Sequence, residues 1–304
     1  MSERATEALN GILPVFKPAG FTSFDVIAKL RGILKTRKLG HAGTLDPMAT
    51  GVLPVFAGLA TKACDLLPDS DKSYIADFRL GISADTQDST GTILRERSFH
   101  HVTMEGLSAA LEPLRGEILQ LPPMYSAVSV NGKRLYELAR QGLEVERTPR
   151  PVTIRALELL DYDTADGTGR LEVSCSKGTY IRTLIHDMGE SLNCGGVMTA
   201  LVRTRAAGFS LEECVTLEEL QNRGGDFQPL LTPVERIFSG LPEIRLSEPQ
   251  AKMYKNGVKL DLNRLSLPQG ETYFRVYGAR EFLGTARADF DKQLLRCEKN
   301  FYER

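Results

Sequence analysis

No stretch of this chain approaches the roughly 18–20 consecutive apolar residues that a membrane-spanning helix needs. Cysteine pairs at C-x-x-C spacing are also missing, because the five cysteines are scattered along the chain. Together with four histidines they offer no closely spaced set of zinc ligands. The first ten residues, MSERATEALN, are polar and carry both charge signs, which is not typical of a signal peptide. We therefore expect a cytoplasmic protein with reduced cysteines, no metal site and a polar N-terminal tail over residues 1–10.

An overall positive charge, the usual sign of a nucleic-acid partner, is absent as well, since the formal net charge is −1. Charge is nevertheless segregated. Residues 17–46 contain six basic side chains against two acidic ones, and residues 133–155 contain six against three. Such runs are often only solvated faces, so they permit a polyanionic partner without demanding one. Neither G-x-G-x-x-G nor a Walker sequence occurs, so we expect no nucleotide cofactor.

What is present is the composition of an ordinary soluble globular protein, 42% hydrophobic and 25% charged over 304 residues. That length suits one large or two modest domains. Around residues 232–242 the apolar pattern becomes irregular. We place a domain boundary there, with a large domain over residues 11–236 and a small, mostly β module over residues 240–304.

Local patterns predict several elements. Residues 11–16 read as a short apolar strand, and Thr22 with Asp25 three residues later predicts a capped helix. From Ser73 onward apolar side chains alternate as in a half-buried strand through Ile82. The remaining expected elements are a helix over 106–114, a turn at Asn131-Gly132, a strand pair over 152–160 and 171–175, a helix after 179, a helix over 247–256, and strands over 273–277 and 282–286.

Asp46 is the strongest candidate for a chemical role. It lies in the loop G-H-A-G-T-L-D-P-M-A-T-G, where glycines and a following proline can hold a carboxylate rigidly. The same Asp-Pro pair can also simply start a turn. His41, on the same loop, could stack on a base or bind a phosphate, or could be an exposed loop histidine.

Further along the chain four residues attract attention. Tyr74 begins a strand whose other residues on that face are apolar, so alone it would be core or rim. Tyr180 and Arg182 flank a strand-to-helix junction, where Arg182 could pair with a buried carboxylate or lie on the surface. Leu201 is by default a core leucine. The residue chemistry alone supports only an α/β enzyme with an acidic loop residue.

Taken together, several segments resemble the TruB family of tRNA pseudouridine-55 synthases, in that family's order and spacing from about residue 11 to residue 205. The segments are Lys17–Ser23, Lys38–Pro54, Lys72–Tyr74, Pro123–Ala127, Gly132–Gly142 and Ser176–Arg182. The resemblance implies an α+β fold, with a mixed, largely antiparallel sheet flanked by helices. After it would come a small β-barrel of the PUA type, matched more weakly by Gly257 and residues 282–286.

This resemblance also implies roles. Asp46 would be the nucleophile that converts uridine at position 55, in the T loop of tRNA, to pseudouridine. Arg182 would pair with Asp46 and keep it ionised. Tyr74 would stack on the flipped base and stand near the position from which a proton leaves, with Tyr180 and Leu201 lining the same pocket.

The remaining implied contacts are with RNA. His41 would help to fill the stack that the flipped nucleotide leaves. The two basic stretches, the first beginning at Lys17, would contact phosphates of the T arm and so bind substrate. Residues 103–150 are a hypothetical clamp. We expect a monomer that needs no metal and no cofactor.

Several alternatives stay open. Asp46 could attack the base at C6 or the sugar at C1′. The chain could instead be a tRNA-binding or tRNA-folding chaperone with secondary or no catalytic activity. A different RNA-modifying enzyme and a metal-dependent hydrolase are the other candidates, but the first lacks a nucleotide-cofactor loop and the second lacks neighbouring ligands.

Overall fold

The structure is a computed structural model that describes residues 9–68, 70–130, 132–279 and 281–302. The first eight residues of the predicted polar tail lie outside the described residues, and so does Asn131 of the predicted turn. Within the described residues no helix is long and apolar enough to cross a membrane.

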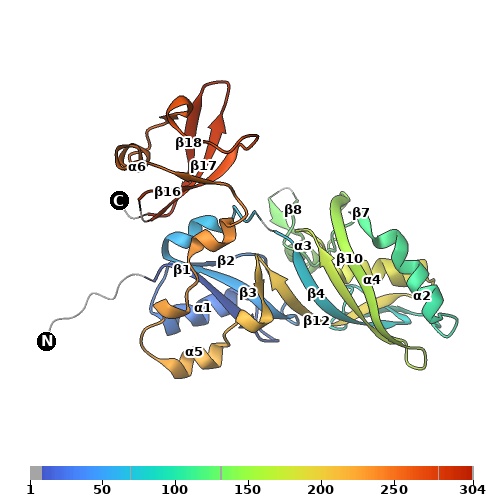
Figure 1. The fold of residues 1–304 in the computed structure, drawn as a ribbon. Helices are drawn as coiled ribbons and strands as arrows, with labels where there is room; N and C mark the ends of the chain where they lie inside the picture. The colour runs from blue at the N-terminus through green and yellow to red at the C-terminus, as the bar shows by residue number, and fades with distance from the viewer. Residues whose placement is uncertain (1–8, 69, 131, 280, 303–304) are drawn as a thin grey trace.

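Nine strands form one large sheet (Figure 1). Seven of them follow the order β1-β3-β12-β4-β11-β10-β7, with β2 beside β3 and β13 beside β12. Their bounds are β1 (Gly11–Lys17), β2 (Leu39–His41), β3 (Thr50–Ala57), β4 (Lys72–Leu80), β7 (Gly116–Gln120), β10 (Arg150–Asp163), β11 (Thr168–Cys175), β12 (Gly196–Ala206) and β13 (Phe209–Ser210). Neighbouring strands are antiparallel except β3 and β12, which run parallel. The sheet is therefore mixed and largely antiparallel, as predicted.

Strand β4 shows why its sequence alternates. Tyr74, Ala76, Phe78 and Leu80 are all buried on one face, against the core beneath helix α4. The predicted strand does not run on to Ile82, because Gly81 has a φ of +90°, which breaks the extended backbone. Ile82 instead begins β5 (Ile82–Ala84), which pairs with β6 (Ile93–Glu96) in a separate hairpin.

Helix α1 (Ser23–Leu34) begins at the predicted cap. The Thr22 hydroxyl accepts the Asp25 amide at 3.0 Å and the Asp25 carboxylate accepts the Thr22 amide at 2.8 Å, which satisfies two amides that the helix itself cannot. The helix ends where Lys35 turns to a φ of +52°. Its apolar face packs on the core that lines β1 and β3.

The other helices flank the sheet at both ends (Figure 1). α5 (Leu217–Arg223) lies beside α1, while α4 (Ile181–Ser191) packs on β12 and β4, and α2 (Met104–Leu111) packs on α4 and β10. The helix predicted over 106–114 thus begins two residues earlier, and its last turn tightens to a 3-10 helix over 112–114. A short hairpin of β8 (Ser129–Val130) and β9 (Lys133–Arg134) leads into α3 (Leu135–Ala139).

After the large sheet the chain forms a second, curled sheet of five strands, with the order β14-β16-β17-β18-β15 (Figure 1). Its elements are β14 (Glu243–Arg245), α6 (Glu248–Lys255), β15 (Leu260–Asp261), β16 (Tyr273–Tyr277), β17 (Phe282–Asp289) and β18 (Leu294–Asn300). The predicted α+β fold with a small C-terminal β module is confirmed. Its assignment to the PUA type and the boundary at residues 236–240 stay predictions.

The two sheets are joined by an aromatic contact. Phe238 lies 6.0 Å from Phe282 and 5.6 Å from Phe301, measured between ring centroids. Beside this contact the Lys62 ammonium donates to the Asn300 carbonyl at 3.1 Å and to its side-chain oxygen at 2.5 Å. The small module is therefore packed against the large one through buried and partly buried rings.

Candidate active site

The loop that carries Asp46 connects β2 to β3 and is held from several sides. The Leu45 amide donates to the Ser23 hydroxyl at 3.0 Å, and the Gly20 amide donates to the Pro47 carbonyl at 2.9 Å. Leu45 is buried, whereas the Asp46 side chain is 36% exposed. The fold thus anchors the backbone on both sides of the carboxylate and leaves the carboxylate itself accessible.

Arg182, the second residue of α4, binds that carboxylate through two of its nitrogens. Its Nε lies 2.9 Å from Oδ2 of Asp46, and its Nη2 lies 3.2 Å from Oδ1. Nη1 and Nη2 also donate to the carbonyls of Thr86 and Tyr125, each at 2.9 Å. The guanidinium is only 4% exposed, so four hydrogen bonds fix its position and, through it, the orientation of the carboxylate.

A second carboxylate, which the sequence reasoning missed, stands beside this pair. Asp88 is buried, and its Oδ2 lies 3.8 Å from Nε of Arg182. Its other oxygen accepts the hydroxyls of Thr86 at 2.7 Å and Thr90 at 2.6 Å. The turn-forming residues over 85–91 predict a turn that contains Asp88, but only the fold places the Asp88 carboxylate beside Arg182.

Tyr74 and Leu201 lie in the same buried cluster as Leu45 and Ala49 of the loop, and each is 6% exposed. Burial raises the pKa of Tyr74 to about 12, while the positive charge of Arg203 beside it opposes that rise. Tyr74 and Leu201 therefore belong to the core on which the loop of Asp46 packs.

Tyr180 is the N-cap residue of α4, and its backbone is fixed by a side chain that the sequence reasoning did not single out. The Tyr180 amide donates to Oε1 of Gln120 at 2.7 Å, and Nε2 of Gln120 donates back to the Tyr180 carbonyl at 3.1 Å. Gln120 is 2% exposed, at the end of β7. A neutral buried amide thus sets where α4 begins and where Arg182 projects.

His41 is half-buried at the end of β2, with its ring 5.9 Å from that of Phe24 in an edge-to-face arrangement. Its Nδ1 is buried without a hydrogen-bond partner among the described residues. Burial, and after it the charge of Arg203, lowers the pKa of His41, so the ring is neutral at physiological pH. A neutral imidazole beside an exposed aromatic ring suits stacking better than phosphate binding.

Lys17 is placed differently from the prediction that it contacts substrate. Its side chain is fully buried, and its ammonium donates to the carbonyls of Pro18, Phe21 and Pro47 at 2.9, 2.5 and 3.2 Å. Burial lowers the pKa of Lys17 to about 8, against the opposing charge of Asp46. The ammonium therefore ties β1 and the turn after it to the loop of Asp46, and its geometry gives no support to a phosphate contact.

Asp46 and Arg182 thus form one contact, and the core beneath the loop of Asp46 includes Tyr74 and Leu201. Tyr180 comes two residues before Arg182, and His41 ends the strand that leads into the loop. An ion-paired, accessible carboxylate with aromatic and apolar neighbours can act as a nucleophile or a base. Among the described residues no group of three or more histidine, cysteine, aspartate or glutamate side chains could hold a metal ion.

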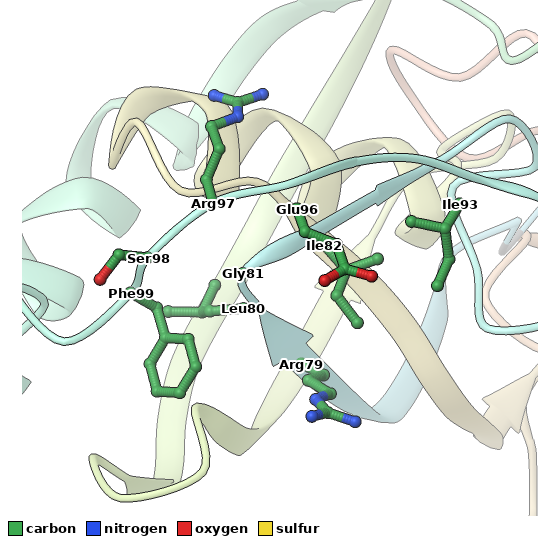
Figure 2. A pocket seen from close by; sticks show the side chains of 9 residues that line it. All are labelled: Arg79, Leu80, Gly81, Ile82, Ile93, Glu96, Arg97, Ser98 and Phe99. Carbon is green, nitrogen blue, oxygen red and sulfur yellow. The ribbon is translucent and has the colours of Figure 1, made fainter.

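A separate hollow of about 560 Å³ lies at the other end of β4, beside Phe99 (Figure 2). Arg79 lines it, and so does Arg97, whose guanidinium pairs with Glu190 at 2.6 Å. None of the predicted site residues lines it. Tyr74 and Leu80 stand six residues apart on β4, which corresponds to about 20 Å of strand, so this hollow is not part of the site.

Comparison with known proteins gives a consistent picture. The family model "TruB family pseudouridylate synthase (N terminal domain)" matches residues 31–181, and "tRNA pseudouridylate synthase B C-terminal domain" matches residues 182–239. The tRNA pseudouridine synthase B of Heliobacterium modesticaldum is 43% identical over 281 residues, which covers 92% of this chain and 91% of the relative. That of Clostridium kluyveri is 40% identical over 291 residues, covering 95% and 99%.

Solved structures of the same fold are also similar. A chain in the crystal structure of a Cbf5-Nop10-Gar1 complex matches with a TM-score of 0.74 and 25% identity, covering 97% of this chain and 85% of that chain. A chain of an H/ACA RNP bound to a substrate RNA containing 2′-deoxyuridine matches with a TM-score of 0.71 and 23% identity, covering 97% and 86%.

Proposed function

This chain belongs to the TruB family of pseudouridylate synthases and is an enzyme that isomerises uridine in tRNA; we propose that its target is position 55 in the T loop and that Asp46 is the nucleophile. The observation that carries this proposal is the two-point contact between Asp46 and Arg182 at an accessible site. A nucleophilic carboxylate must keep its direction, and a buried guanidinium that binds both oxygens provides this.

The proposed reaction needs no redox partner, because its product is an isomer of its substrate. The bond between N1 of uracil and C1′ of ribose breaks, the base turns, and a bond forms between C5 and C1′. C5 loses a proton and N1 gains one. Asp46 assists by attacking either C6 of the base or C1′ of the sugar, and both routes require the same positioned carboxylate.

The residues around Asp46 take supporting roles in this proposal. Tyr74 stacks on the flipped uracil and stands where C5 loses its proton, while Leu201 and Tyr180 form the walls of the pocket. The pair of His41 and the exposed Phe24, packed edge to face, supports the role of His41 because its ring can occupy the stack that the flipped nucleotide leaves. The buried, apolar setting of Tyr74 and Leu201 supports these roles because it keeps bulk water from the base.

Exposed cations of the two basic stretches supply the proposed contacts to T-arm phosphates. They are Lys29, Arg31, Lys35, Arg37 and Lys38 in the first stretch, and Lys133, Arg134, Arg140, Arg150 and Arg155 in the second. Such contacts give position and salt-dependent affinity, while unpaired loop bases are recognised by stacking. A tRNA substrate fits the cytoplasmic location that the sequence predicts. The monomeric state and the clamp over residues 103–150 stay predictions.

The target position is tested by mapping. An unmodified tRNA transcript is incubated with the enzyme and treated with a carbodiimide that marks pseudouridine, and the marks are located by primer extension. The proposal expects one stop, at position 55, which disappears when that uridine is replaced by cytidine. A stop at another uridine, with position 55 unmodified, would contradict the assignment of the T loop while leaving the family's chemistry intact.

A further inference from the structure

Arg203 is the largest fully buried side chain of the described residues, with 0% of its surface exposed, yet no ion pair within the described part of the chain includes it. Burying a guanidinium without a carboxylate is unfavourable even after relaxation of the surroundings. Burial accordingly lowers the pKa of Arg203. A cation kept in such a place needs an explanation beyond packing.

Two of its nitrogens are used by the backbone around the site. Nε donates to the Val52 carbonyl at 2.8 Å, and Nη2 donates to the Gly43 carbonyl in the loop of Asp46 at 3.0 Å. The third, Nη1, is buried and lacks a partner of good hydrogen-bond geometry among the described residues. A Cβ on Gly43 would lie 3.3 Å from Nη1, so the loop approaches this end of the guanidinium closely.

Strand pairing places Arg203 directly opposite Tyr74. The two residues are direct partners in the antiparallel pairing of β12 with β4, so their side chains share one face. An irregularity in that pairing follows immediately, between Arg203 and Arg205, and bulges of this kind redirect side chains near active sites. On its other side β12 meets Gly51 of β3, where a Cβ would lie 2.2 Å from the Arg203 carbonyl oxygen.

Charge links the two side chains as well. The positive charge of the Arg203 guanidinium opposes the effect of burial on the pKa of Tyr74. The other titratable groups that act on Tyr74 are Cys175 on β11 and Asp46, and both favour the neutral phenol. Arg203 is thus the cation that makes ionisation of Tyr74 less unfavourable.

We propose that Arg203 is the positioning residue for Tyr74, holding its hydroxyl in place and stabilising its ionised form so that the oxygen accepts the proton that leaves C5. This inference rests on the proposed function. Tyr74 first gives its own proton to solvent. The phenolate oxygen then forms a bond to the C5 proton, and the electron pair of the broken C–H bond returns to the uracil ring.

Tritium release from C5-labelled tRNA under single-turnover conditions tests the inference in three variants. R203M removes the charge and is expected to slow release about 100-fold, the scale of a lost acid–base contribution, with little change in tRNA affinity. R203K keeps the charge and should lose less. R205M, on the exposed next-but-one residue of β12, is the matched control and should keep the wild-type rate.

A more acidic tyrosine at position 74 distinguishes two roles of Arg203, namely stabilising the ionised phenol and merely stabilising the backbone of the loop. With 3,5-difluorotyrosine at position 74, R203M should recover roughly tenfold in rate at neutral pH, and the pH–rate profile of the otherwise wild-type enzyme should shift to lower pH. If R203M does not fold, as judged by far-UV circular dichroism, R203K and the shifted profile decide the question.

The outcomes distinguish two failures. A wild-type enzyme that releases no tritium overturns the proposed function and this inference together. The inference alone is overturned if the wild-type enzyme releases tritium but two results fail. The acidic tyrosine then does not relieve the defect of R203M or R203K, and the pH–rate profile does not shift. Arg203 would in that case only stabilise the backbone of the loop.

Discussion

Arg182 binds Asp46 as a fork, with Nε 2.9 Å from one carboxylate oxygen and Nη2 3.2 Å from the other. The residues are 136 positions apart in the chain. The Arg182 guanidinium is fixed by the carbonyls of Thr86 and Tyr125 and flanked by Asp88. The direction of the Asp46 carboxylate is therefore set by α4 together with two further segments, the turn of Thr86 and Asp88 and the segment of Tyr125.

Replacing Arg182 with lysine keeps the positive charge but removes the planar fork. We expect R182K to reduce the single-turnover rate at least about 100-fold, because one ammonium cannot hold both oxygens and both carbonyls, while tRNA affinity changes little. The matched control is R170K, which alters the exposed fork between Arg170 and Asp77 on β11 and β4. Equal effects of the two substitutions on the rate would contradict the role of the Arg182 fork.

Gln120 should matter for stability as well as rate. Q120L leaves the Tyr180 amide and carbonyl without their partners in a buried place, so we expect a loss of about 1–3 kcal/mol in the free energy of unfolding. Because Arg182 projects from the same helix start, the rate should fall too. Urea unfolding and tritium release measure the two effects. A variant as stable and as fast as wild type would show that the Gln120 contact does not position α4.

The lowered pKa of Lys17 predicts how the free energy of unfolding should depend on pH. Its pKa falls from an ordinary 10.5 to about 8 in the fold, so between these values the unfolded chain binds more protons than the native one. Stability attributable to Lys17 must therefore rise as pH increases from about 8 towards 10.5. The free energy of urea unfolding of wild type minus that of K17M should grow between pH 8 and pH 10. Parallel curves for the two proteins would rule out a depressed Lys17 pKa.

Replacing Phe301 tests whether the aromatic contact between the two sheets is needed to fix the position of the small module. F301A removes one of three packed rings between the two sheets, and we expect unfolding to become easier by about 3–5 kcal/mol. If the module helps to bind tRNA, KM should rise more than kcat falls. F290A, at an exposed phenylalanine of the same module, is the control. An unchanged KM in a folded F301A would argue that the module's orientation is irrelevant to binding.

Features that depend on nearby residues were predictable from the sequence. The cap formed by Thr22 and Asp25 and the alternation along β4 both follow from local geometry, and the structure confirms them. The loop of Asp46 was recognisable from its glycines and proline. Its pairing with Arg182 was expected only through family resemblance, since no local rule connects residues so far apart.

Features that depend on long-range packing were missed. The burial of Arg203 results from the parallel pairing of β12 with β3, and the spacing of apolar residues in the sequence does not predict that pairing. Gln120 and Asp88 look like ordinary surface residues in the sequence, and only the fold encloses them. Lys17 begins the basic stretch that the resemblance assigns to phosphate contacts, whereas three carbonyls enclose its ammonium here.

The most direct test of the account measures tritium released to water from a tRNA transcript labelled at C5 of its uridines, with wild type and D46N compared side by side. D46N is nearly isosteric, so binding of tRNA to it should persist. The account predicts release of about one label per tRNA by wild type and none by D46N. Release by D46N at the wild-type rate would contradict the role of Asp46, and no release by either protein, despite tight and salt-sensitive binding, would favour a tRNA chaperone.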